Sequence, residues 1–213
     1  MDEDVHIRER FLLLEQEKKK KLQELHDRLR DELNEKRKKY SSLVLEIGCG
    51  HGHFLNAYAQ QYTNTLCIGI DIIKKRLEKC ERKKHIAGIN NVLFFRHEAV
   101  EFLSHFPKNY TIDEIFVLFP DPWPKNRHAK NRLFQPEFLD IAKNQQIKTI
   151  YLRTDSKNYI QWTQFQLNKR ADDWTYTDAF IWPFEHTTFF QQIHPTFFSL
   201  KIDNKKYTQP SSL

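Results

Sequence analysis

The stretch Leu43-Val44-Leu45-Glu46-Ile47-Gly48-Cys49-Gly50-His51-Gly52 decides the fold. An apolar run typical of a buried strand leads into three alternating glycines, and a helical pattern follows from Phe54. Glycine lets a backbone turn sharply and approach a ligand, and α/β folds bind ligands at the carboxyl edge of their parallel sheets. The stretch therefore predicts the first strand, ligand-binding turn and helix of an α/β fold.

The glycine spacing argues against a nicotinamide dinucleotide as the ligand. That fingerprint is G-x-G-x-x-G, but His53 stands where its third glycine would be. Asp71 ends the next apolar run, where a carboxylate can accept both ribose hydroxyls of a nucleoside. Glu98 follows the third run and could accept from an adenine amino group, although capping of the next helix explains it nearly as well.

After Tyr40, short apolar runs alternate with helical stretches, a pattern typical of βαβ units. Strands are expected at 43–47, 66–70, 92–95, 114–119 and 147–152, and helices at 54–61, 74–87, 99–106, 136–143 and 157–169. The aromatic and Thr-rich tail over 174–202 should add two antiparallel strands at the sheet edge. The predicted fold is a doubly wound, mostly parallel, seven-stranded Rossmann-like α/β sheet.

A long charged helix is predicted before this fold. Residues 7–39 lack Gly and Pro, and Leu22, Leu25, Leu29 and Leu33 share one helical face. Residues 1–39 carry 12 Lys+Arg and 11 Asp+Glu, and this near balance favours packing on the domain or on a second copy over RNA binding. We divide the chain into this helix, 1–39, and one domain, 40–213.

The composition of the 213-residue chain narrows the classes of partner and location. The net charge of +6 favours a polyanionic partner. Cys49, Cys67 and Cys80 have neither disulfide nor zinc-knuckle spacing, and the group Cys49, His51 and His53 lacks a nearby fourth ligand, so no metal is expected. No run approaches the roughly 20 apolar residues of a membrane span, and we expect a cytoplasmic protein.

The most specific stretch runs from Phe119 to Arg132, FPDPWPKNRHAKNR, and begins where the fourth strand should end. Its three prolines stiffen the loop, Trp123 offers a stacking face and Asp121 a fixed acceptor. Its cations, Lys125, Arg127, Lys130 and Arg132, offer contacts to phosphate.

These motifs together resemble a known family. The E-x-G-x-G-x-G turn resembles motif I of the class I S-adenosylmethionine-dependent methyltransferases. Phe119–Arg132 and the later Arg153-Thr154-Asp155 resemble the bacterial single-chain tRNA (guanine-N7) methyltransferases, over roughly residues 42–202. The resemblance implies that S-adenosylmethionine is the cofactor, and that it contacts Glu46, Gly48, Gly50, Gly52, Asp71, Glu98 and Asp121. It also implies that Asp121 is the carboxylate of the catalytic site.

The resemblance further implies a transfer RNA substrate, methylated on a guanine of the variable loop and contacted by Lys125 and Asp155. The family's T-x-[FY]-E element, expected to touch the target base, corresponds here to Thr188-Phe189-Phe190-Gln191, with Gln191 in place of Glu. The long N-terminal helix is a second departure. We expect a monomer or homodimer without an obligatory protein partner. The alternatives are methylation of an exocyclic amine in RNA or DNA, and a catalytically silent RNA-binding module.

Overall fold

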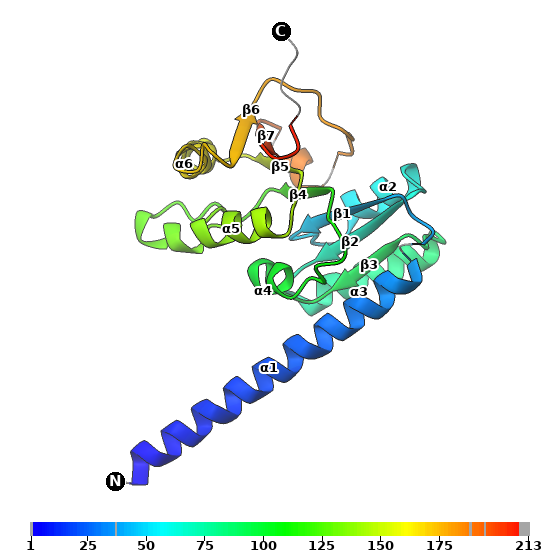
Figure 1. Ribbon diagram of the computed structural model, residues 1–213. Helices are drawn as coiled ribbons and strands as arrows, with labels where there is room; N and C mark the ends of the chain where they lie inside the picture. The colour runs from blue at the N-terminus through cyan, green and yellow to red at the C-terminus, as the bar shows by residue number, and fades with distance from the viewer. Residues whose placement is uncertain (1, 37, 188, 194, 209–213) are drawn as a thin grey trace.

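One seven-stranded sheet forms the centre of the protein in a computed structural model that describes residues 2–36, 38–187, 189–193 and 195–208 (Figure 1). Its strands are β1 Ser42–Ile47, β2 Thr65–Ile70, β3 Val92–Phe95, β4 Glu114–Leu118, β5 Thr149–Thr154, β6 Trp174–Thr177 and β7 Phe198–Asn204. The order is β3-β2-β1-β4-β5-β7-β6. The first five strands pair in parallel, and β7 pairs antiparallel with both β5 and β6. The predicted fold class and the antiparallel pair at the edge are confirmed.

Helices cover both faces of this sheet. They are α1 Asp2–Lys36, α2 His53–Gln61, α3 Lys74–Ile86, α4 Ala99–Ser104, α5 Pro136–Asn144, α6 Lys157–Asn168 and α7 Phe189–Ile193, with a 3-10 helix η1 at Asn126–Asn131. Alternate residues of β1 enter two separate cores, because successive side chains of a strand point to opposite faces. Leu43 and Leu45 pack with α1, α4, α5 and α6, whereas Val44 packs with α2 and α3.

Two strand ends differ from the sequence prediction for identifiable reasons. β4 ends at Leu118 because Phe119 turns to a left-handed backbone with φ of 49°. β5 is shifted by two residues from its predicted range: it begins at Thr149 and ends at Thr154, where it pairs with Phe198 of β7. Such a long-range pairing leaves no local signal in the sequence.

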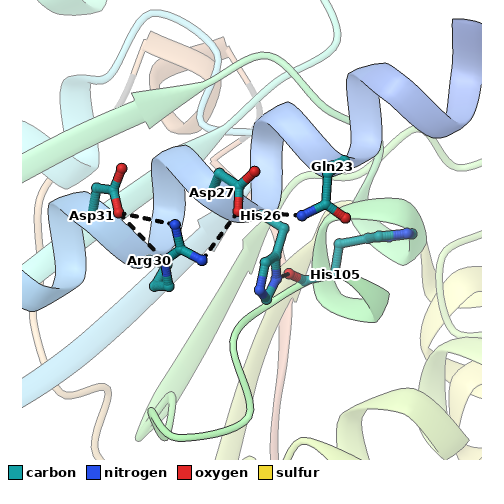
Figure 2. Close-up of polar contacts among 6 residues, drawn as sticks. All are labelled: Gln23, His26, Asp27, Arg30, Asp31 and His105. Carbon is teal, nitrogen blue, oxygen red and sulfur yellow. Dashed lines mark hydrogen bonds and ion pairs between the residues drawn. The ribbon is translucent and has the colours of Figure 1, made fainter.

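The second half of α1 belongs to the core of the domain. Leu25, Leu29 and Leu33 are buried beside sheet residues, so the leucine stripe packs on the domain. His26 Nδ1 lies 2.9 Å from the carbonyl oxygen of His105 at the end of α4 (Figure 2). The first half of α1 projects away from the sheet and its helices (Figure 1). Within the described ranges, no helix is long and apolar enough to cross a membrane.

Candidate functional site

The turn after β1 is built from glycines in the left-handed region. Gly48, Gly50 and Gly52 have φ of 72°, 55° and 68°, values that other residues rarely adopt. A Cβ added at Gly52 would lie 2.9 Å from Cys80 Sγ on α3. The path of the chain and the close approach of α3 therefore both require glycine there.

Asp71, directly after β2, ties the first two loops of the carboxyl edge together. Its side chain is buried. Oδ2 accepts from the Gly50 backbone N–H at 3.0 Å, and Oδ1 accepts from the Ile73 N–H at 2.8 Å. Arg76 Nη1 lies 3.5 Å from Oδ2. A carboxylate offers about four acceptor positions, so Asp71 can hold both loops and Arg76 and keep about one position for a ribose hydroxyl.

Glu46 is a buried acid and the penultimate residue of β1. Within the described part of the chain, its Oε2 has no hydrogen-bond partner. Burial raises the pKa of the Glu46 carboxyl well above its usual range, and the neighbouring Cys80 and Asp71 raise it further. An acid left in this condition is a candidate for contact with a ligand that carries donors or positive charge.

A cavity of about 690 Å³ opens where the carboxyl ends of β1, β2, β3 and β4 meet. This volume lies in the range of small-molecule sites. Of the residues predicted from the sequence, its lining includes Gly48, Asp71, Glu98, Asp121, Lys130 and Arg132. Ile72, Ile73, His97 and Trp123 complete much of the wall, and burial lowers the pKa of His97. Asp71, Glu98 and Asp121 therefore meet at this cavity, whereas Glu46, Gly50 and Gly52 lie outside its lining.

Glu98 both caps a helix and lines this cavity. Its Oε2 accepts from the backbone N–H of Val100 at 2.8 Å and of Glu101 at 3.0 Å, at the start of α4. The capping alternative is confirmed. Because Glu98 also lies in the cavity wall, capping does not remove it from the predicted adenine contact.

The loop after β4 carries Asp121 on an unusual backbone. Phe119 and Trp123, on either side of it, have φ of 49° and 42°, which costs conformational energy in non-glycine residues. The Phe119 N–H donates to the Arg153 carbonyl at 2.7 Å, which fixes the loop's start beside β5. Asp121 itself is exposed and lies in the cavity wall.

Arg132 binds backbone carbonyls of this loop with its buried side chain. The residue is buried, with Nε donating to the Pro122 carbonyl at 3.1 Å and Nη2 to the Trp123 carbonyl at 3.0 Å. Its guanidinium lies over the rings of Tyr159 and Trp162, at 5.8 and 5.3 Å from their centroids. We predicted a phosphate contact for Arg132, but this buried position suits a role in shaping the loop.

The other cations of the loop, Lys125, Arg127 and Lys130, are exposed. Asp155, directly after β5, is half-buried and stands outside the cavity lining. Gln191 lies in the short helix α7, also outside the lining, and Thr188 lies outside the described residues. The roles predicted for these residues in substrate binding stay predictions.

Sequence reasoning missed the ion pair that anchors the C-terminal segment. Arg153, buried on β5, binds Glu185 through two contacts of 2.9 and 2.7 Å, and its guanidinium lowers the pKa of that carboxyl. The same guanidinium lies 4.0 Å from the centroid of the Trp182 ring and 4.4 Å from that of Phe197. Arg153 belongs to the motif Arg153-Thr154-Asp155, but no spacing rule in the sequence indicates a partner 32 residues later.

No group of three or more His, Cys, Asp or Glu side chains is placed to hold a metal ion within the described ranges. Lys83 Nζ lies 2.9 Å from His53 Nε2, so a cation accompanies this histidine. Burial, followed by the charge of Lys83, lowers the pKa of His53.

Comparison with known proteins decides the family. The profile of the family described as "Putative methyltransferase" matches residues 40–190. The chain belongs to this methyltransferase family. A relative named tRNA (guanine-N(7)-)-methyltransferase from Buchnera aphidicola subsp. Schizaphis graminum is 35% identical over 124 residues, which cover 57% of this chain and 52% of that one. A relative of the same name from Mycoplasma genitalium is 35% identical over 135 residues, or 61% and 63%.

The chain therefore spans about half to two thirds of the length of these curated relatives. Its fold resembles that of a 16S rRNA (adenine(1408)-N(1))-methyltransferase from Catenulisporales acidiphilia, solved with its cosubstrate. The TM-score is 0.58 at 15% identity, covering 84% of this chain and 93% of that one. The resemblance to the methyltransferase family predicted from the sequence is confirmed.

The cavity of this methyltransferase fits the cofactor that its family implies. Its wall offers the carboxylates of Asp71 and Glu98, which are the acceptors predicted for a ribose and for an adenine amino group. The unpartnered Oε2 belongs to buried Glu46, which lies outside the cavity lining next to Ile47 and Gly48, so a contact between Glu46 and the cofactor stays a prediction. The left-handed turn at Gly48 leaves backbone rather than side chain at the cavity wall.

Proposed function

We propose that this methyltransferase transfers a methyl group from S-adenosylmethionine to N7 of a guanine in transfer RNA. One observation carries the proposal: the loop from Phe119 to Arg132 is held by a buried arginine so that Asp121 lies in the wall of the cavity. The cavity wall also holds Asp71 and Glu98, the acids assigned to the cofactor. The names of the relatives support the same substrate, which would place the reaction in the cytoplasm.

In the proposed reaction the protein aligns the methyl group with guanine N7 and stabilises the charge that develops on the base. S-adenosylmethionine, when bound, supplies a methyl group that its sulfonium already activates. Guanine N7 carries a lone pair, so no side chain has to remove a proton from the nucleophile. The carboxylate of Asp121 would accept from the N1–H and the exocyclic amine of the guanine, which fixes the base. Its negative charge would also favour the positive charge that grows on the ring.

Exposed cations beside the cavity support an RNA substrate. Lys125 and Arg127 are exposed and lie outside the cavity lining, and Lys130 is exposed where it also lines the cavity. On the other side, α3 presents Lys74, Lys75, Arg76, Lys79 and Arg82 to solvent. Burial, followed by the charges of Lys79 and Lys83, lowers the pKa of His51 in the glycine turn. Phosphates on both sides of the cavity would meet positive charge.

The test is to incubate the protein with labelled S-adenosylmethionine and unmodified transfer RNA, and then to identify the labelled nucleoside. The proposal expects 7-methylguanosine, and mapping the label would test the variable loop as its position. A label on an exocyclic amine would replace the proposed reaction by the first alternative. Tight RNA binding with no labelled product would favour the silent RNA-binding module.

A further inference from the structure

The first half of α1 projects from the domain and is not covered by it. The ion pair between Lys18 Nζ and Glu101 Oε1, 2.6 Å apart, lies near the point where the helix leaves α4. Every described side chain from His6 to Lys21 is exposed. Residues 2–17 extend this arm by about 24 Å at the rise of an α-helix. Most of the stability of a helix in a protein comes from tertiary packing, so a partner surface would stabilise the arm.

The projecting arm carries large apolar side chains on the face that continues the buried stripe. Ile7, Phe11 and Leu14 are 62%, 61% and 57% exposed. They follow the same spacing of three and four residues that places Leu22, Leu25, Leu29 and Leu33 on one side of the helix. An exposed apolar face of this kind marks an interaction with another protein surface.

We propose that residues 7–18 of α1 pair antiparallel with the same residues of a second copy of this chain. In a heptad, Phe11 and Lys18 occupy a positions, and Ile7 and Leu14 occupy d positions. An antiparallel pair with its twofold axis between residues 12 and 13 brings each a position against a d position. Phe11 of each copy then packs on Leu14 of the other. The aliphatic stem of Lys18, whose ammonium binds Glu101 of its own copy, lies along Ile7 of the other copy.

The charges beside the apolar stripe match this pairing. Arg8 and Glu15 stand at e positions, and Arg10 and Glu17 stand at g positions. An antiparallel pair brings e against e and g against g, so Arg8 meets Glu15 and Arg10 meets Glu17, each twice because the interface is symmetric. A parallel pair would instead bring Lys18 against Lys18, a repulsion that disfavours it.

The same charges favour a second copy over an anionic partner. The paired segment, residues 7–18, carries Arg8, Arg10 and Lys18 against Glu9, Glu15 and Glu17, a net charge of 0. Such a segment has no electrostatic attraction to RNA phosphate or to an anionic lipid surface. The bound partner must offer an apolar stripe flanked by charges of both signs, and the arm itself has these properties.

The experiment compares two faces of the same arm in the full chain. Phe11→Glu/Leu14→Glu charges the proposed interface, whereas Leu13→Glu charges an apolar residue that is 60% exposed but lies off the stripe. Sedimentation equilibrium should show a dimer for the wild type. The double variant should raise the dimer dissociation constant on the order of 100-fold or more, because two apolar anchors per copy are lost. Leu13→Glu should change it by less than about 5-fold, as surface changes usually do.

Charge reversal tests the pairing of the flanking residues. Arg8→Glu/Arg10→Glu should weaken the dimer, and adding Glu15→Arg/Glu17→Arg should restore it. Orientation is tested by oxidising Ile7→Cys, since Cys49, Cys67 and Cys80 are buried and free. In the antiparallel pair the two thiols introduced at position 7 are far apart. Ile7→Cys should therefore form an intermolecular disulfide no faster than Leu13→Cys does.

Several results would overturn the proposal. A wild-type protein that stays monomeric at tens of micromolar would do so, whether or not it binds anionic vesicles or RNA through the arm. A dimer that persists in Phe11→Glu/Leu14→Glu would place the interface elsewhere. An equal rise of the dimer dissociation constant in Leu13→Glu would show that the contact is not specific to the face of Ile7, Phe11 and Leu14. Rapid linkage through Ile7→Cys would show a parallel pair. The melting temperature of each variant, compared at a concentration where all are monomeric, verifies that the domain is folded.

Discussion

Two loops at the carboxyl edge of the sheet are held in place by different means. The turn after β1 is fixed by its own glycine backbone and by hydrogen bonds from Gly50 and Ile73 to Asp71. The loop after β4 is held at its start by the bond from Phe119 to the Arg153 carbonyl, and further along by the buried side chain of Arg132, which reaches two carbonyls of the loop. A turn set by main-chain geometry is encoded locally, whereas a loop set by one side chain can be loosened by a single substitution.

The largest effect is expected at the tip of the second loop. Asp121→Asn keeps the size of the side chain but removes its charge and turns one acceptor into a donor that faces the donors of guanine. A loss of roughly 3–4 kcal/mol of transition-state stabilisation would slow turnover about 10²- to 10³-fold. Single-turnover rates with transfer RNA, together with calorimetry for the cofactor, measure the two effects separately.

Cofactor affinity in Asp121→Asn should stay within a few-fold of the wild type. Since no proton is taken from N7, the wild-type chemical step should also lack a log-linear rise between pH 6 and 8, which a general base would produce. Near-normal turnover in Asp121→Asn, or such a rise with pH, would contradict the role assigned to this carboxylate.

The support of the second loop should be the next most sensitive position. Arg132→Met keeps an apolar stem under Tyr159 and Trp162 but leaves the carbonyls of Pro122 and Trp123 without their charged donor. Each lost charge-assisted bond is worth about 1.5 kcal/mol, so stability should fall by roughly 3 kcal/mol and turnover should fall with it. Denaturant unfolding and turnover measure both effects.

Arg127→Met is the matched control for that change, because it removes the same charge from an exposed position of the same loop. It should leave stability within about 0.5 kcal/mol of the wild type. It should also lower the salt slope of transfer RNA binding by about one. If Arg132→Met instead changes the salt slope and leaves stability intact, the buried arginine faces the RNA after all.

The same contrast explains how far the sequence could predict the site. Gly48, Asp71 and Glu98 could be placed because local patterns mark the ends of strands, and parallel strands bring those ends to one edge. The burial of Arg132 could not be predicted, since the sequence presents it as one of four similar cations in the loop. The pairing of Arg153 with Glu185 was equally hidden, because it depends on the long return from β6 to β7.

At the first loop, substitution of Asp71 should lower cofactor affinity, with a smaller effect than the changes at Asp121 and Arg132. Asp71→Ala removes a charged acceptor from the proposed ribose contact, a loss of roughly 1.5–3 kcal/mol, or about 10- to 100-fold in cofactor affinity. The glycine turn also loses the acceptor of the Gly50 N–H. Asp71→Asn keeps one acceptor oxygen, so its cofactor affinity should lie between those of the wild type and Asp71→Ala. Calorimetry on the folded variants measures this affinity. Unchanged affinity in Asp71→Ala would place the ribose elsewhere.

The smallest effect is expected at Glu46, where stability and cofactor binding should respond in opposite ways. Burial raises the pKa of Glu46, so the folded protein binds its proton more tightly than the unfolded chain does. The stability of the wild type should therefore fall as the pH rises above about 4.3, the ordinary value for Glu, until the pH passes the raised value. Glu46→Gln lacks this titration. The melting temperature of Glu46→Gln relative to the wild type should increase between pH 5 and 8, by about 2–4 °C for each kcal/mol of destabilisation relieved. Saturating S-adenosylmethionine should reduce this difference, because a positive group near the Glu46 carboxylate favours its charged form. The cofactor should also bind Glu46→Gln less tightly. A melting-temperature difference that stays constant with pH would show that Glu46 is charged in both the folded and the unfolded states.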